Sequence, residues 1–126
     1  GDNIGIKIVE VSTGKSVFYA PGLGEITDET RQLMSESDCL LVDGTFWSEN
    51  EMQKVGLGNK LASDMGHLPQ SGTGGMLEVL RPMKRPRKIL IHINNTNPIL
   101  NEESEQRIKV VAEGIEVAYD GMEVEL

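Results

Sequence analysis

The sequence predicts a mixed α/β fold in which helices pack on a sheet. Two short segments are typical of buried strands: the continuous apolar run at 39–42 and the isoleucine- and leucine-rich segment 88–93. An alternating apolar pattern with a turn precedes the first run, and helical patterns separate the two runs. Strands and helices in this order favour a mixed sheet with helices packed on it.

The chain begins with a predicted β-hairpin. Residues 4–11 carry isoleucine at alternate positions, and residues 13–15 supply a turn that contains glycine. Residues 16–20 then form the second strand of the hairpin.

A helix follows the hairpin after a loop. Thr27 or Asp28 caps its first turn, and the acidic Asp28 and Glu29 suit the positive end of a helix dipole. The helix is expected to run to about Ser35.

The middle of the chain combines a buried strand with two short helices. The pattern predicts a strand at 39–42 ending at Asp43-Gly44, a helix from Ser48 through Val55, an ordered loop at 60–75 and a helix at 76–80. Ser48 and Glu51 have the spacing of a capping box, which predicts where the first of these helices begins.

The last third of the chain is predicted to add a strand, a helix and a hairpin. The strand covers 88–93, the helix begins at Asn101 and closes at Gly114, and two final strands cover 115–119 and 122–126. The intervening Asp120-Gly121 has the composition of a hairpin turn.

Length and composition predict one domain covering residues 1–126 and exclude several partners. Twelve Lys and Arg against 20 Asp and Glu give a net charge of −8, which argues against a nucleic-acid partner. The single Cys39 lies in an apolar run and is expected to be a buried thiol in a reducing compartment. Because no apolar run approaches the roughly 20 residues that span a membrane, and no signal peptide is recognisable, a cytoplasmic protein without membrane partners is expected.

Three polar side chains stand at the ends of predicted strands or in the glycine-rich loop. Asp43 and His92 lie at the carboxyl ends of the two buried strands, and His67 lies in the loop between them. Ligands of α/β folds bind at the carboxyl ends of strands, so these side chains are candidates for one site. Imidazoles ligate zinc or iron, and a carboxylate ligates a metal or orients a neighbouring imidazole. Each residue alone also fits a purely structural hydrogen-bonding role.

Further candidates flank these positions. Trp47 follows the Asp43 loop and either walls a pocket or covers the core. Asn94 and Asn95 lie in the amide-rich loop 94–98 after His92, where such side chains bond their own backbone before a proline or contact a substrate.

Five segments of the chain closely resemble the coenzyme pyrroloquinoline quinone (PQQ) biosynthesis protein B family. They are residues 19–25, 41–47, 64–72, 91–98 and 114–122. The resemblance extends over essentially the whole chain, and the family's own chain is longer at its amino end. It implies the αββα sandwich of the metallo-β-lactamase superfamily, of which this chain is the C-terminal αβ half.

The resemblance also implies roles for site residues. By similarity to the superfamily's tRNA-maturing endonucleases, His92 is a metal ligand, while Asp43 and His67 form an acid/base or orienting pair. Those hydrolases place a bridging Asp after the strand that corresponds to 17–20. Here Pro21-Gly22 stands instead, which argues against a two-metal hydrolytic centre.

The implied activity is an iron- and oxygen-dependent hydroxylation in PQQ biosynthesis. Its substrate is the tyrosine ring of a peptide-derived, cross-linked Glu-Tyr precursor, its metal is Fe(II) with Zn(II) as the alternative, and Trp47, Asn94 and Asn95 contact the substrate. A carrier for PQQ or its precursor and a residual metal-dependent hydrolase are the other hypotheses. Other PQQ biosynthesis proteins are expected partners, and so is the missing N-terminal half, without which the uncovered sheet face predicts self-association.

Overall fold

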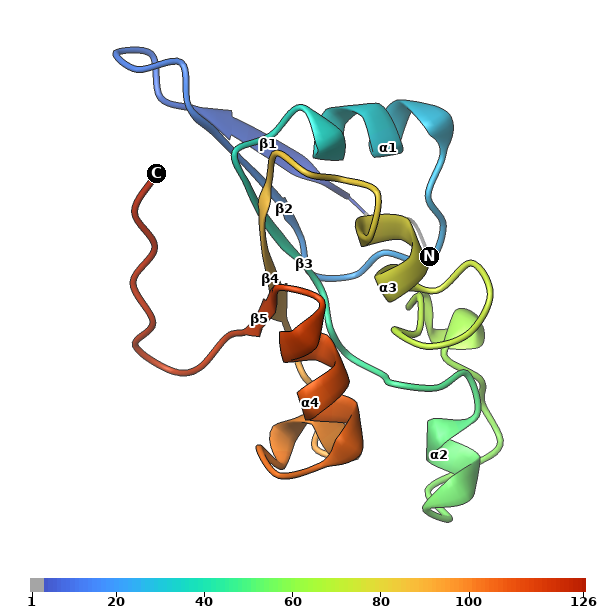
Figure 1. Ribbon diagram of the computed structural model, residues 1–126. Coiled ribbons are helices and arrows are strands. Elements are labelled where there is room, and N and C mark those ends of the chain that lie inside the picture. Colours follow the sequence, from blue (N-terminus) through green and yellow to red (C-terminus); the bar gives the residue numbers. More distant parts are fainter. Residues whose placement is uncertain (1–3) are drawn as a thin grey trace.

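The computed structural model describes residues 4–126, which form a five-stranded sheet with helices on one face (Figure 1). The strands lie in chain order and are β1 (Ile6–Val9), β2 (Ser16–Ala20), β3 (Cys39–Asp43), β4 (Arg87–Ile91) and β5 (Ile115–Val117). β1 is antiparallel to β2, and all the other neighbours are parallel. The predicted mixed α/β fold is confirmed.

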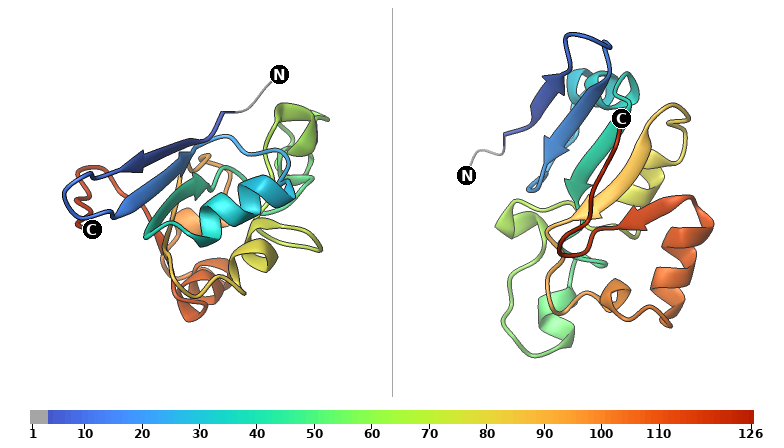
Figure 2. Two further views of the ribbon diagram at one scale, coloured as in Figure 1. Left: turned by 90° about the horizontal axis from the view of Figure 1, so that it is seen from above. Right: turned by 90° about the vertical axis from the view of Figure 1, so that its left-hand side faces the viewer.

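Three helices cover one face of the sheet (Figures 1 and 2). They are α1 (Asp28–Ser35), α3 (Met76–Leu80) and α4 (Glu105–Ala112). The short helix α2 (Glu51–Lys54) lies beyond the carboxyl ends of the strands. Two 3-10 turns, Ser63–Met65 and Pro98–Leu100, lie in the loops after β3 and β4.

The sheet alternates between a core face and an open face. Phe18, Leu40, Val42 and Leu90 point toward the helices and are buried in the hydrophobic core. The residues between them point to the opposite face because successive side chains of a strand alternate. The core face therefore carries Leu40 and Val42 of β3 and Leu90 of β4, and the open face carries Leu41, Ile89 and Ile91.

The open face leaves large apolar side chains accessible to solvent. Ile6, Ile8 and Tyr19 are 50, 60 and 39% exposed. The register pairs Ile6 with Tyr19, which in turn pairs with Leu41 of β3, so these side chains share the face. The C-terminal segment 118–126 runs across this side of the sheet (Figure 2).

Two predicted element boundaries are wrong at the carboxyl end of the chain. The last helix begins at Glu105, because the hydroxyl of Ser104 and not Asn101 accepts the hydrogen bond from the Arg107 N–H. The predicted hairpin of 115–119 and 122–126 does not form either. β5 pairs with β4 instead, which satisfies its backbone on one side, and among the described residues 118–126 contain no strand.

The predicted capping box at Ser48 is also wrong. Asn50 precedes the first residue of α2, and no side chain caps that helix. The carboxylate of Glu51 instead accepts hydrogen bonds from the Trp47 N–H, at 2.9 Å, and from the Thr96 hydroxyl, at 2.5 Å. Glu51 is therefore a buried link between the loops that follow β3 and β4.

Two further expectations, the cap at Thr27 and the buried thiol at Cys39, agree with the structure. Thr27 caps α1 by accepting from the Thr30 N–H at 3.1 Å. Cys39 is a free, buried thiol, and burial raises its pKa. Among the described residues, no helix combines the length and apolar character needed to cross a membrane.

Asp38 joins the starts of three strands. Its carboxylate accepts from the Ser16 N–H at 2.8 Å and contacts the guanidinium of Arg85 at 3.2 Å. Its backbone carbonyl accepts from the Arg87 N–H. The Ser16 hydrogen bond, helped by Arg85, lowers the pKa of Asp38 below its usual 3.8.

This lowered pKa gives a pH-dependent expectation for Asp38→Asn. The carboxylate stabilises the fold at pH values above 3.8, and the stabilisation disappears as the pH falls through the lower pKa of the folded state. Thermal unfolding should therefore show a lower melting temperature for the variant at neutral pH and a gap that narrows in acid. Asp120→Asn, at an exposed position, is the control. A gap that is constant with pH contradicts this role.

The open face gives an expectation about association. An exposed apolar surface of this kind usually marks an interface or aggregation, so the 126-residue chain should self-associate through it. Sedimentation of Ile8→Lys should show a larger monomer fraction than the unmodified chain. Ile108→Lys is the matched control, because Ile108 is equally exposed, at 60%, but lies on α4. Equal effects of the two variants contradict association through the open face.

Candidate metal and acid/base site

The structure brings the three predicted polar side chains together. Asp43 is the last residue of β3, His92 directly follows β4, and His67 follows the 3-10 turn Ser63–Met65. One ligand-type atom from each residue lies within 4.8 Å of those of the other two. The cluster therefore forms where the carboxyl ends of two parallel strands meet, as expected for an α/β sheet.

Asp43 is fully buried and accepts four hydrogen bonds. Oδ2 accepts from the Leu23 N–H at 2.9 Å and from Nδ1 of His67 at 2.8 Å. Oδ1 accepts from the Thr45 N–H at 3.0 Å and from its hydroxyl at 2.7 Å. Because an ionised carboxylate offers about four acceptor positions, all of those of Asp43 are occupied. Asp43 thus orients its neighbours, and ligating a metal would cost it one of these donors.

His67 is held by Asp43 through one ring nitrogen. A carboxylate only accepts hydrogen bonds, so Nδ1 of His67 carries the proton and Nε2 keeps its lone pair. The edge of the ring meets Phe46 with a centroid distance of 5.7 Å, and its face stacks on His92 at 5.6 Å with an interplanar angle of 17°. This arrangement suits a general base or a metal ligand.

His92 has an unusual backbone conformation. Its φ is +56°, in the left-handed region, and it is the only described non-glycine residue with a positive φ. Such a conformation costs on the order of 1 kcal/mol and often marks a functional position. Here it ends β4 and directs the imidazole to Thr45, whose hydroxyl lies 2.9 Å from Nδ1. The side chain remains exposed.

Gly44 allows the two strand ends to approach each other. Its N–H donates to the carbonyl of Ile91 at 2.7 Å. A Cβ at this position would lie 2.5 Å from Cδ1 of Ile93 and 2.8 Å from Cβ of Leu90. Only glycine therefore fits between Asp43 and the end of β4 without displacing the segment that carries His92.

Two buried amides support the loop after β3. Asn97 donates through Nδ2 to the carbonyl of Gly44 at 3.0 Å and to Oε1 of Gln70 at 2.7 Å, while its Oδ1 accepts from the Ile99 N–H. Gln70 is fully buried. These amides fix the backbone carbonyls of Asp43 and Gly44, so they are structural supports of the cluster.

The three predicted substrate contacts lie in the loops around the cluster. Trp47 is half-buried and packs against the core. Asn94 is half-buried and donates to the Thr96 hydroxyl at 2.6 Å, whereas Asn95 is exposed. Of the three, Asn95 has the side chain most accessible to another molecule.

Sequence reasoning missed Thr45, Gln70 and Asn97 as parts of the site. Thr45 stands two residues after Asp43, a spacing at which a hydroxyl reaches back to a carboxylate, and this was the available signal. No such short-range signal pairs Gln70 with Asn97 or with the backbone of Asp43 and Gly44, because these groups meet only when the loops fold.

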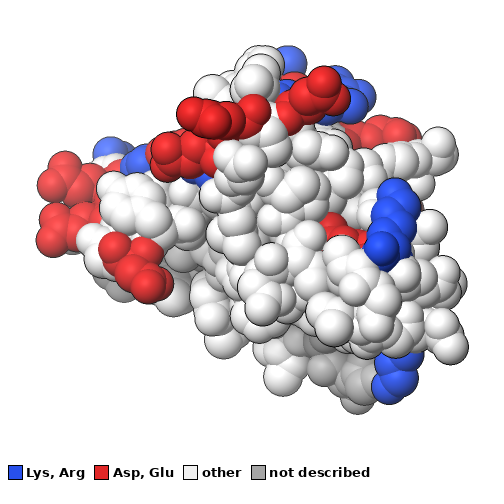
Figure 3. All heavy atoms as spheres, turned by 90° about the horizontal axis from the view of Figure 1, so that it is seen from below, with Lys and Arg blue, Asp and Glu red and all other residues white. Residues whose placement is uncertain are grey.

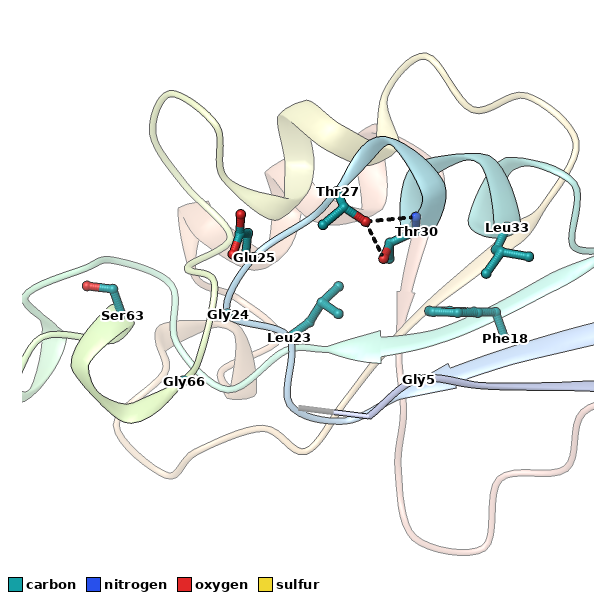
Figure 4. Close-up of a pocket in the computed structure, with 10 residues that line it drawn as sticks. All are labelled: Gly5, Phe18, Leu23, Gly24, Glu25, Thr27, Thr30, Leu33, Ser63 and Gly66. Atoms are coloured by element: carbon teal, nitrogen blue, oxygen red, sulfur yellow. Dashed lines mark hydrogen bonds between the residues drawn. The ribbon is translucent and has the colours of Figure 1, made fainter. Parts of the chain in front are cut away.

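The surface around the carboxyl ends of the strands carries few charges. Seen from below, it is mostly uncharged, with most acidic side chains at its left and upper edges and basic ones both beside these and at the right (Figure 3). A hollow of about 660 Å³ lies between β2, the start of α1 and the 3-10 turn Ser63–Met65. Its lining includes Phe18, Leu23, Glu25 and Thr27 (Figure 4). None of the three cluster residues lines this hollow.

Comparison with known proteins identifies the family. Residues 1–93 match the family model described as the beta-lactamase superfamily domain. The chain belongs to the beta-lactamase superfamily. Within this superfamily it is 60% identical over 124 residues to coenzyme PQQ synthesis protein B of Nitrosococcus oceani and 57% identical over 126 residues to that of Methylococcus capsulatus. The predicted membership of the PQQ protein B family is confirmed.

A solved structure of this family has the same fold. The crystal structure of Zn²⁺-bound PqqB from Methylobacterium extorquens matches 97% of this chain with a TM-score of 0.91 and 36% identity. This chain covers 43% of that structure, and it spans 40 and 41% of the length of the two curated relatives.

The donor set of the cluster suits a transition-metal ion. Two imidazoles and a carboxylate are ligand types that zinc and iron both accept. Nδ1 of His67 is hydrogen-bonded to the carboxylate of Asp43. Metal-ligating histidines usually have such a hydrogen-bond partner on the ring nitrogen that does not bind the metal. Metal binding by this cluster is therefore chemically plausible, and its donors do not select between zinc and iron.

Gly44→Ala tests the close approach of the strand ends. The added methyl group should displace Ile93 and the end of β4, lowering the free energy of unfolding by about 1–3 kcal/mol. Urea unfolding followed by tryptophan fluorescence would measure the change. Gly14→Ala is the control, because its positive φ strains the backbone but its Cβ meets nothing within 4 Å. A smaller loss at Gly44 than at Gly14 contradicts the packing constraint.

Proposed function

We propose that this chain supplies part of the active site of an enzyme of PQQ biosynthesis. The reaction is hydroxylation of the tyrosine ring of a peptide-derived, cross-linked Glu-Tyr precursor. One atom of O2 enters the ring, and the other leaves as water with two electrons from a reductant. Similarity over the whole chain to proteins named coenzyme PQQ synthesis protein B supports the pathway.

The observation that carries the proposal is the Asp43–His67–His92 cluster. Its carboxylate is occupied by four donors, whereas the imidazole of His92 is exposed at the end of a strand. This contrast favours His92 as the metal ligand and Asp43 as an orienting group. A bound Fe(II) would supply the one-electron chemistry that O2 reactions need.

His67 would move a proton during the reaction. Its Nε2 keeps a lone pair because Nδ1 donates to Asp43, so Nε2 can accept the phenolic proton of the tyrosine ring. The buried charge of Asp43 would then stabilise the resulting imidazolium. This division of labour resembles other pairs in which a carboxylate holds an imidazole in one tautomer.

The open face is where the remaining parts of the site would join. Asp43 lies on the same face of β3 as Leu41, because side chains alternate along a strand. A further αβ layer that covers this face would border the cluster and could supply the other metal ligands. Other PQQ biosynthesis proteins would deliver the precursor, and Trp47, Asn94 and Asn95 would contact it.

An anaerobic Fe(II) titration tests the assignment of the two histidines. In a protein of the relatives' full length, His92→Ala should lower Fe(II) affinity by more than the roughly tenfold to hundredfold that loss of an outer hydrogen-bond partner of a ligand causes. After O2 and a reductant are added, mass spectrometry of the precursor should show no gain of an oxygen atom. His67→Ala should retain Fe(II) affinity but slow the hydroxylation by about 10²- to 10⁴-fold.

Val111→Ala, at an exposed position on α4, serves as the control for both variants. Unchanged Fe(II) affinity in His92→Ala would contradict its role as a ligand. If the unmodified protein binds no iron and does not hydroxylate the precursor, but binds PQQ, the carrier hypothesis is favoured.

Zinc chemistry is the second candidate, because the similar crystal structure contains Zn²⁺. The loop after β2 argues against a two-metal hydrolase. It contains Pro21-Gly22, and its contact with the cluster is the Leu23 N–H, which donates to Asp43. Zn²⁺-dependent cleavage of an ester or amide by the full-length protein would favour the hydrolase over the oxygenase.

A further inference from the structure

We infer that Thr45 is a positioning residue that fixes the tautomer and direction of the His92 imidazole. Through this hydroxyl the single carboxylate of Asp43 orients both histidines of the cluster, His67 directly and His92 at one remove. The inference rests on the proposed role of His92 as a metal ligand, and it assigns a function to a residue outside the predicted site.

The hydroxyl of Thr45 lies at the centre of the cluster. Its Oγ1 is 2.7 Å from Oδ1 of Asp43, 2.9 Å from Nδ1 of His92 and 3.1 Å from Nδ1 of His67. Three polar atoms thus surround one hydroxyl, which has a single proton to donate and two lone pairs to accept with.

The direction of each hydrogen bond follows from the carboxylate. Asp43 can only accept, so the short contact between Oγ1 and Oδ1 requires the Thr45 proton to point to Asp43. That proton is then unavailable to His92, and the contact at 2.9 Å must run from a protonated Nδ1 of His92 to Oγ1. Nε2 of His92 therefore keeps its lone pair and is the nitrogen free to bind a metal.

Nδ1 of His67 bonds mainly to Asp43, and only weakly to the hydroxyl of Thr45. Its Nδ1 lies 2.8 Å from Oδ2 of Asp43 and 3.1 Å from Oγ1 of Thr45. The charged acceptor at the shorter distance makes the stronger hydrogen bond. His92, in contrast, has Thr45 as the side-chain partner of its Nδ1 among the described residues.

The position of Thr45 is itself fixed. The residue is buried, its N–H donates to Oδ1 of Asp43 at 3.0 Å, and its carbonyl accepts from the Asn94 N–H at 3.1 Å. Threonine also has restricted χ1 freedom because it is branched at Cβ. The hydroxyl is therefore held in place before any ligand binds, which is what orienting an exposed imidazole requires.

Thr45→Val and Thr45→Ser separate this role from a structural one. Valine keeps the shape of the side chain and removes the hydroxyl, whereas serine keeps the hydroxyl. Long-range ¹H–¹⁵N spectra of histidine-labelled, metal-free protein, recorded where both rings are neutral, report which ring nitrogen carries the proton. We expect both histidines to carry it on Nδ1 in the unmodified protein and in Thr45→Ser.

In Thr45→Val, His92 should shift toward the Nε2–H form that predominates in free histidine, while His67 stays Nδ1–H because Asp43 still holds it. His67 is thus an internal control for the fold of the cluster. Persistence of the Nδ1–H form of His92 in Thr45→Val would overturn the inference. Loss of the Nδ1–H form of His92 in Thr45→Ser would also overturn the inference.

Metal affinity supplies a second, independent readout. Zn²⁺ titrated against a competing chelator should bind about tenfold to a hundredfold more weakly to Thr45→Val, with Thr45→Ser close to the unmodified protein. Unchanged affinity in Thr45→Val beside a loss in His92→Ala overturns the positioning role. Unchanged affinity in His92→Ala contradicts the proposed function instead, and the tautomer spectra still decide the role of Thr45.

Discussion

The buried carboxylate of Asp43 is the interaction on which the site depends. A charge removed from water is costly unless hydrogen bonds compensate it. Its four donors come from three different segments: the loop after β2, the turn after β3 and the loop that carries His67. Leaving any of them unmade would cost more than the bond itself contributes. The hydrogen bonds to the Asp43 carboxylate therefore hold these three segments together at the end of β3.

The backbone around this carboxylate gives the histidines their directions. Gly44 lets the end of β3 bond to the end of β4, and the left-handed conformation of His92 then turns the chain out of the sheet beside it. Asn97 donates to the backbone carbonyl of Gly44 and to the side chain of Gln70, and Gln70 donates to the carbonyl of Asp43. Without these bonds the two carbonyls would be buried with fewer partners. The site is thus held by main-chain contacts as much as by side chains.

The sequence was informative wherever a short-range pattern determined the outcome. The apolar run at 39–42 predicted a buried strand, and the polar residues after it and after β4 predicted where side chains would meet. Where two local signals competed, the prediction was wrong. Asn101 and Ser104 are both favoured helix caps, and packing decides which of them begins the helix. Glu51, Gln70 and Asn97 bond to partners distant in the chain, so no local pattern could assign them. The final segment 118–126 contains no strand and runs across the open face, although the outer edge of β5 is not paired with another strand of the described sheet.

The left-handed backbone of His92 restricts how this position can change over evolutionary time. Asparagine, aspartate and glycine accept such a backbone readily, but none of them offers an imidazole. Glutamine or glutamate would retain a polar ligand atom, at the price of more backbone strain and a longer reach. Aspartate is therefore the substitution that keeps both the turn and a metal-ligating atom, and a lineage that abandons a metal bound here would be expected to show glycine or asparagine instead. On the proposed assignment of His92 as a metal ligand, the identity of residue 92 would distinguish metal-binding relatives from relatives that have lost the metal.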